Sequence, residues 1–175
     1  MRRAALALVV VLAACGPKQG EGPPVGVSTN DGTATLSDKP TVYAFDSLDE
    51  DRPINSDVLK GRVVVLAFIT TGSFEAQAQA NYLNAMAKND GDKTFYGLLA
   101  LHPRKEIVLV ETYRSSIGLK IPIALADGGA TSAAGPFGEI PAVPTVVVLD
   151  RFGKLVWKHT GLAKADEIRA QIRNL

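Results

Sequence analysis

Three apolar runs along the chain predict the centre of a β-sheet. They cover Val63–Ile69, Thr94–Leu101 and Thr145–Leu149. Short continuous runs rich in β-branched residues are typical of strands that are covered on both faces. Residues 41–48 alternate more loosely between apolar and polar positions, which predicts a further strand before the first run.

Helical periodicity follows the first apolar run. Ser73 is a favourable N-cap, Glu75 in the first turn complements the helix dipole, and apolar residues then recur at helical spacing. Residues 89–92, Asn-Asp-Gly-Asp, end this predicted helix. Two further helices are predicted over residues 104–117 and 163–175.

The last third of the domain predicts a hairpin. Residues 150–153, Asp-Arg-Phe-Gly, form the predicted turn, and residues 154–159 return antiparallel to Thr145–Leu149. Residues 121–125 predict a short extended piece, whereas residues 126–138 follow no clear pattern. Strands thus alternate with helices early, and a hairpin and a helix come last. This order predicts an α/β domain with a central mixed β-sheet and helices on both faces.

The N-terminus predicts a signal peptide over residues 1–14. Arg2 and Arg3 precede eleven apolar residues, which are too few to span a bilayer but enough for the apolar part of a secretory signal. The sequence Leu-Ala-Ala-Cys at residues 12–15 resembles the lipobox of bacterial lipoproteins. This resemblance implies cleavage before Cys15, acylation of its sulfur and anchoring in the lipid bilayer. The alternative is an ordinary secretory signal with a coincidental cysteine.

A change of composition after Cys15 predicts a tether and a single domain. Residues 15–39 are interpreted as the lipidated cysteine and a flexible tether, because they are rich in Gly, Pro, Ser and Thr without a period. Residues 40–175 form the predicted domain. Gly16 stands where an aspartate would resemble an inner-membrane retention signal. We therefore expect a lipid-anchored protein of the cell envelope, at the outer membrane facing the periplasm rather than at the inner membrane.

Charge and cysteine content exclude two classes of function. The chain has 19 Lys and Arg against 18 Asp and Glu, so it offers no electrostatic reason to bind nucleic acid. It has one cysteine, Cys15. If Cys15 carries a lipid, no cysteine remains to form a disulfide, even in an oxidising compartment.

Three motifs together resemble a known family. Residues 61–68 read Gly-Arg-Val-Val-Val-Leu-Ala-Phe, residues 143–145 read Val-Pro-Thr, and residues 150–156 read Asp-Arg-Phe-Gly-Lys-Leu-Val. In this order they resemble the central strand, the cis-proline loop and the hairpin of TlpA-like thioredoxins and peroxiredoxins, the redoxin group. The resemblance covers residues 40–175 and implies a thioredoxin-like fold. It also implies that the peptide bond before Pro144 is cis and faces the active-site helix.

The chain departs from this family at the redox site. By alignment, Ser73 and Ala76 stand where the family has its attacking and resolving cysteines. The chemistry needs a thiolate, and a serine hydroxyl would need a nearby base to act as a nucleophile. His102 and His159 lie in no recognisable triad motif and are too isolated to predict a metal site. Ser73 is therefore interpreted as a helix cap, and no catalytic residue, metal or cofactor is expected.

The same alignment predicts a recognition groove beside the start of the helix. Its predicted residues are Gly72, Phe74, Val143, Pro144 and Thr145. In the family, the residue before the cis-proline offers backbone groups that pair with an extended peptide, and Val143 occupies that position here. The sequence leaves open whether Phe74 is exposed in the groove or folded into the core.

The sequence leaves three functions open. The favoured hypothesis is a membrane-anchored lipoprotein without redox activity, whose thioredoxin-like domain binds an envelope protein or an extended peptide, or serves in assembly. The alternative is a thiol-disulfide oxidoreductase or peroxidase that uses an external thiol. The third is a purely structural envelope protein. Residues 49–51, Asp-Glu-Asp, are interpreted as a solvated turn, because they lack the spaced ligands and the glycine of a calcium loop.

Overall fold

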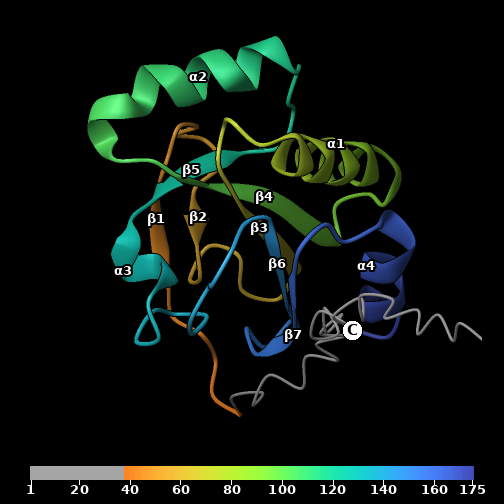
Figure 1. Ribbon diagram of the computed structural model, residues 1–175. Coiled ribbons are helices and arrows are strands. Elements are labelled where there is room, and N and C mark those ends of the chain that lie inside the picture. The colour runs from red at the N-terminus through yellow and green to blue at the C-terminus, as the bar shows by residue number, and fades with distance from the viewer. Residues whose placement is uncertain (1–37) are drawn as a thin grey trace, which may run out of the picture.

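The computed structural model describes residues 38–175, which form one seven-stranded mixed sheet with flanking helices (Figure 1). The predicted signal peptide, Cys15 and most of the predicted tether lie outside the described residues. The strands are β1 (Ala44–Ser47), β2 (Ile54–Asn55), β3 (Val63–Ile69), β4 (Thr94–Leu101), β5 (Ile123–Ala126), β6 (Thr145–Leu149) and β7 (Leu155–Thr160). The helices are α1 (Phe74–Asn89), α2 (Ile107–Ser116), α3 (Gly128–Thr131) and α4 (Ala165–Ile172), with a 3-10 turn at Arg104–Glu106.

The order of strands across the sheet is β2-β1-β5-β4-β3-β6-β7. Strand β3 lies between β4, which runs parallel to it, and β6, which runs antiparallel. The carboxyl ends of β3 and β4 therefore meet at one edge of the sheet, at the pair Ile69 and Ala100. The β6–β7 hairpin turn lies at the opposite end of β3, because Val64 pairs with Leu149.

Strand β3 separates two hydrophobic layers because its successive side chains point to opposite faces. Val65, Ala67 and Ile69 pack in the layer that contains the buried faces of α1, α2 and α4. Leu66 and Phe68 pack in the second layer, which is covered by α3 and by irregular segments. All seven residues of β3 are buried. Burial of each large aliphatic side chain contributes about 1.5–3 kcal/mol, so β3 is the centre of the core.

The predicted fold class is confirmed, with differences at the edges of the sheet. The central strands β3, β4 and β6 have the predicted bounds. The strand predicted over residues 41–48 is shorter, and the two-residue strand β2 was not predicted. On the second face the helical layer is reduced to α3, because loop residues such as Tyr43 and Phe137 cover most of that face.

Two predicted helices are shorter than expected. The helix predicted over residues 104–117 begins as a 3-10 turn and becomes α-helical at Ile107. The helix predicted over residues 163–175 is α4, which starts at Ala165. Within residues 38–175, no helix is both long enough and apolar enough to cross a bilayer.

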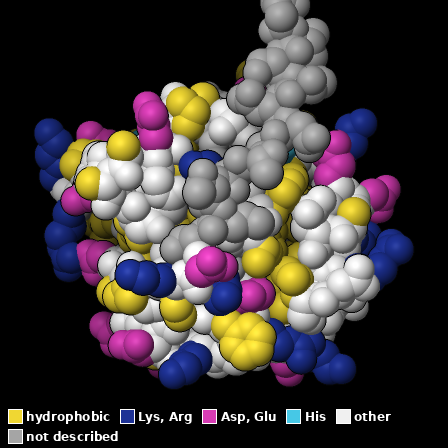
Figure 2. Space-filling view, turned by 90° about the horizontal axis from the view of Figure 1, so that it is seen from below, with side chains coloured by type: hydrophobic (Ala, Val, Ile, Leu, Met, Phe, Trp, Pro, Cys, Tyr) yellow, Lys and Arg dark blue, Asp and Glu magenta, His cyan; other side chains and the backbone are white. Residues whose placement is uncertain are grey.

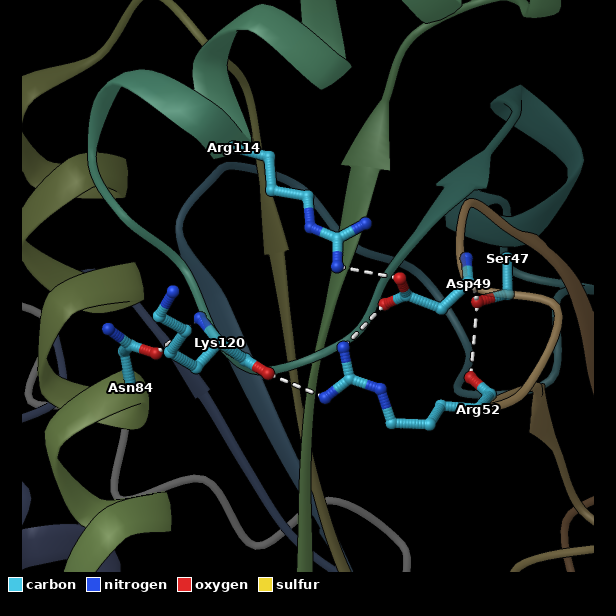
Figure 3. Close-up of polar contacts among 6 residues, drawn as sticks. All are labelled: Ser47, Asp49, Arg52, Asn84, Arg114 and Lys120. Carbon is cyan, nitrogen blue, oxygen red and sulfur yellow. Dashed lines mark hydrogen bonds and ion pairs between the residues drawn. The ribbon is translucent and has the colours of Figure 1, made fainter.

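The interpretation of residues 49–51 as a solvated turn is wrong for Asp49, which is an ion-pair centre (Figure 3). Its side chain is only 15% exposed. Arg52 Nη2 lies 2.9 Å from Asp49 Oδ2, and Arg114 Nη2 of α2 lies 2.6 Å from Asp49 Oδ1. The ion pair could not be predicted because Arg114 is distant from Asp49 in sequence. The carboxylate thus joins the β1–β2 loop to α2.

The same network continues to helix α1 through backbone groups (Figure 3). Arg52 donates a second hydrogen bond to the carbonyl oxygen of Lys120. The backbone N–H of Lys120 donates to Asn84 Oδ1 of α1 at 2.8 Å. Three segments far apart in sequence are therefore tied together at this end of the molecule.

The end of the domain where the described chain begins carries exposed apolar side chains. Thr41 bonds there to Gly153 of the β6–β7 turn, and Val42 and Phe152 are 81% and 76% exposed. Viewed from below, hydrophobic side chains lie among charges of both signs (Figure 2). The β6–β7 turn, which carries Phe152, and the candidate site described next lie at opposite ends of β3.

Candidate functional site

Ser73 joins strand β3 to helix α1 and caps the helix. It has extended backbone angles (φ −107°, ψ 135°), and its hydroxyl accepts a hydrogen bond from the backbone N–H of Ala76 at 3.3 Å. The same hydroxyl donates to Glu75 Oε2 at 2.8 Å. This bond and the backbone N–H of Glu75 lower the pKa of the Glu75 carboxyl. The hydroxyl of Ser73 is thus bonded to the backbone of Ala76, whose side chain is fully buried.

The start of α1 is open to solvent. Phe74 is 88% exposed, which answers the question that the sequence left open, and Gly72 is exposed as well. Within residues 38–175, the backbone N–H groups of Gly72, Ser73 and Phe74 donate no hydrogen bond to another group. Unpaired N–H groups at a helix N-terminus favour oxygen acceptors and negative charge.

The loop before β6 lies at the same end of the sheet. Thr145, the first residue of β6, pairs with Phe68 near the end of β3, and the Val143–Pro144 bond is cis as the resemblance implied. Val143 is half-buried, and its N–H and C=O have no hydrogen-bond partner among residues 38–175. The carbonyl of Pro144 accepts from the N–H of Gly161 at 2.8 Å, which fixes the loop.

The predicted groove residues divide into exposed and buried ones. Gly72 and Phe74 are exposed and Val143 is partly exposed, whereas Pro144 and Thr145 are buried. The Thr145 hydroxyl bonds inward to the carbonyl oxygen of Ala142 at 2.6 Å. The side chains that a ligand could touch here are therefore those of Phe74 and Val143.

Ser73 has a weak candidate base and no histidine partner. Its hydroxyl contacts Glu75, and a carboxyl group with a lowered pKa is a weaker base. Neither histidine within residues 38–175 contacts Ser73. His159 lies on β7 and stacks on Trp157 with a centroid distance of 5.4 Å.

His102, by contrast, joins two residues that sequence reasoning did not single out. Its Nε2 lies 3.1 Å from the Thr71 hydroxyl, and its Nδ1 lies 2.9 Å from Glu106 Oε2. These two contacts of His102 were not predicted from the sequence, which shows no triad motif around either histidine. The parallel register of β3 and β4 explains why Thr71 and His102 meet. Ile69 pairs with Ala100, and Thr71 and His102 each lie two residues beyond that pair.

Among the residues that the structure describes, no group of three or more His, Cys, Asp or Glu side chains is placed to hold a metal ion. His102 and Glu106 make the only His–carboxylate ion pair of residues 38–175. Two protein ligands fall short of the three or four that catalytic and structural zinc sites use.

Comparisons with solved structures agree with this architecture. A DsbF homologue from Corynebacterium diphtheriae is similar with a TM-score of 0.67 and 19% identity, over 78% of this chain and 86% of that chain. A secreted Mycobacterium tuberculosis disulfide oxidoreductase homologous to E. coli DsbE has a TM-score of 0.61 and 19% identity, over 79% and 100%. The fold is thioredoxin-like.

A third similar structure is the exposed lipoprotein thioredoxin of Streptococcus pneumoniae, with a TM-score of 0.64 and 20% identity over 77% of this chain and 99% of that chain. No protein-family profile matches the sequence, and no curated protein matches it. At these identities the likeness shows the thioredoxin-like fold alone.

Proposed function

We propose that the protein is a lipid-anchored protein of the cell envelope whose thioredoxin-like domain binds an extended peptide or a partner protein and performs no thiol chemistry. The observation that carries this proposal is the cap of α1. Ser73 bonds to the N–H of Ala76, so the two positions where the related fold has its cysteines hold a hydroxyl and a buried methyl group.

The absence of sulfur at these positions removes the redox reaction for a physical reason. Thiol-disulfide exchange proceeds by attack of a thiolate on a disulfide sulfur, and a helix N-terminus assists by lowering the pKa of a thiol. The same field does not bring a serine hydroxyl into range. No cysteine occurs within residues 38–175, so a dithiol couple in the domain would need a sulfur from outside.

Two features at this end of the sheet support recognition of an extended peptide. Val143 presents an unpaired N–H and C=O, and such groups are the usual means by which a peptide adds to an exposed edge. Phe74 presents a large aromatic side chain that is 88% exposed beside the start of α1. Aromatic side chains are enriched among the residues that dominate binding energy. We therefore place the partner between Phe74 and Val143.

The lipid anchor is the part of the proposal that rests on Cys15. In the native protein, we expect Cys15 to carry the lipid and the protein to fractionate with outer membranes. Cys15→Ser should release the protein to the soluble fraction and abolish incorporation of a fatty acid label. A Cys15→Ser variant that stays membrane-bound would contradict the anchor without affecting the argument for the binding surface.

The binding proposal is tested by photocrosslinking in the producing cell. A benzophenone amino acid replaces Phe74 in one variant, and Phe152 in a matched control, because Phe152 is also strongly exposed but lies at the other end of β3. We expect a discrete crosslinked product from position 74 that is absent from position 152. The same products from both positions, or none from position 74, would favour the purely structural role.

The alternative function, an oxidoreductase or peroxidase with a borrowed thiol, makes a different prediction. Such an enzyme would have to form a mixed disulfide with its thiol donor. Mild oxidation of the lipidated protein with glutathione, followed by intact mass measurement, should yield no glutathione adduct if our proposal holds. A stoichiometric adduct would favour the alternative.

A further inference from the structure

A hydroxyl, an imidazole and a carboxylate form a continuous chain next to the start of α1. Thr71 Oγ1 lies 3.1 Å from His102 Nε2, and His102 Nδ1 lies 2.9 Å from Glu106 Oε2. The His102 side chain is 12% exposed, whereas that of Glu106 is 42% exposed. A nucleophile bonded to a base, with the base oriented by a third group, is the arrangement of hydroxyl nucleophiles in general.

The backbone N–H of Thr71 selects the tautomer of the His102 imidazole. Its N–H points at His102 Nε2 at 3.3 Å, and a backbone N–H can only donate. Nε2 therefore carries the lone pair and Nδ1 carries the proton, which is donated to Glu106. This is the tautomer in which Nε2 can accept a proton from the Thr71 hydroxyl.

We propose that Thr71, His102 and Glu106 form an acyl-transfer site that acts on small carboxylic esters. In the first step Thr71 Oγ1 attacks the ester carbonyl carbon, and the hydroxyl proton passes to His102 Nε2. The C–O bond to the leaving alcohol then breaks, and the alcohol takes that proton from His102. Water, deprotonated by the same imidazole, hydrolyses the acyl-Thr71 ester to release the carboxylic acid and restore the hydroxyl.

Unpaired backbone donors lie next to the nucleophile. The N–H groups of Gly72, Ser73 and Phe74 have no partner among residues 38–175 and follow Thr71 directly in the chain. Backbone N–H groups at such a position can stabilise the negative oxygen that develops during acyl transfer. The site thus has a nucleophile, a base, an orienting group and candidate oxyanion donors.

A cleft borders His102 but is not lined by Thr71 or by residues 72–74. It has a volume of about 660 Å³, which is the size of a small-molecule site. Its apolar lining includes Phe45, Leu125 and Ala126, and the Arg104–Asp46 ion pair lies at its surface.

The test uses p-nitrophenyl acetate and the full-length protein carrying Cys15→Ser, which removes the only thiol. We expect a burst of nitrophenolate and an acetyl group on the peptide containing Thr71, located by mass spectrometry after acid quenching. Thr71→Val replaces the hydroxyl with a methyl group of similar size and should abolish both the burst and the adduct. His102→Gln should slow acylation about 100-fold, the lower end of general-base contributions.

The matched controls are Thr70→Val, an adjacent residue of the same type, and His159→Gln, the other histidine. Both variants should be acylated like the parent. Thr71→Ser keeps a hydroxyl at this position and should still form the adduct, which separates loss of the hydroxyl from misfolding of the Thr71→Val variant. The proposal is overturned if Thr71→Val turns over the ester like the parent, if the acetyl group is on another residue, or if the folded parent gives no adduct at all.

Discussion

Ser73 accepts a hydrogen bond from the backbone N–H of Ala76, three residues further along in the first turn of α1. The hydroxyl is the N-cap of α1. Ala76 is fully buried, so a side chain at this position packs under the start of α1 rather than facing solvent. In our proposal, these two residues occupy the positions of a redox site that has lost its sulfur.

This relationship predicts that sulfur can be restored. In a protein that also carries Cys15→Ser, Ser73→Cys together with Ala76→Cys should form an internal disulfide. The two residues lie at the N-cap and in the first turn, three positions apart, and helix geometry brings residues at this spacing close enough for a disulfide. Free-thiol titration before and after oxidation is the measurement. The single Ser73→Cys variant is the control and should keep its thiol; a double variant that also keeps both thiols would show that the site is misplaced.

A second prediction concerns the cap itself. Ser73→Ala should lower the free energy of unfolding by about 1 kcal/mol, because the N–H of Ala76 loses its acceptor. Ser73→Asp should retain most of the stability, because its side chain accepts the same bond and favours the positive end of the helix dipole. Urea unfolding followed by circular dichroism measures both. Equal stability of Ser73→Ala and the parent would contradict the role of the hydroxyl as a cap.

A third prediction concerns Asp49, at the opposite end of the molecule from Ser73. Its substitution should lower the free energy of unfolding more than Ser73→Ala does. Asp49→Ala should lower the free energy of unfolding by about 2 kcal/mol, between the values for exposed and buried ion pairs, because Arg114 loses its carboxylate partner and Arg52 loses one of its two acceptors. Thermal unfolding at low and high salt is the measurement, and Asp51→Ala, an exposed neighbour, is the control. A change no larger than that of the control would mean that solvent screens the network.

Tyr96 predicts a loss of stability in alkali. Burial and a 2.5 Å hydrogen bond donated to Asp90 both raise the pKa of the Tyr96 phenol, so the folded state holds the proton more tightly than the unfolded state. The resulting stabilisation is complete at pH values below the tyrosine pKa of the unfolded state, about 10. Above that pH it is lost at about 1.4 kcal/mol per pH unit. Between pH 10 and 11, the free energy of unfolding of Tyr96→Phe should therefore fall less steeply with pH than that of the parent.

The control for this pH dependence is Tyr82→Phe on the surface of α1, where the side chain is 37% exposed. The free energy of unfolding is measured in urea at each pH. At neutral pH, Tyr96→Phe should be less stable than the parent by about 1 kcal/mol, since Asp90 loses a hydrogen bond. A parallel pH dependence of Tyr96→Phe and the parent would contradict the assignment.

The sequence predicts the parts of the fold that depend on burial. Val63–Ile69 and Thr145–Leu149 have the predicted bounds because runs buried on both faces leave no ambiguity of period. Strand β2 could not be predicted, because two residues, Ile54 and Asn55, have no period. Its place is set instead by pairing with β1. The ends of α4 could not be predicted closely, since a terminal helix is defined by few buried residues beyond Ile168.

The site was predictable only where the chemistry is local. The cap by Ser73 follows from residues that are neighbours in sequence, and its bond to Ala76 agrees with that prediction. The chain from Thr71 to His102 joins residues 31 positions apart, and only the parallel register of β3 and β4 brings them together. Likewise, Asp49 reads as one of three acidic residues until α2 brings Arg114 to it.

The most direct test of the central claim compares reduction of insulin by dithiothreitol in the presence of two proteins, each carrying Cys15→Ser. One has the native Ser73 and Ala76, and the other has cysteine at both positions. We predict no turnover above a heat-denatured control for the first protein, and at least about tenfold more for the second, since only the second holds a dithiol at a helix start. Turnover by the first protein equal to that of the second would contradict the claim that this thioredoxin-like domain has lost its redox chemistry.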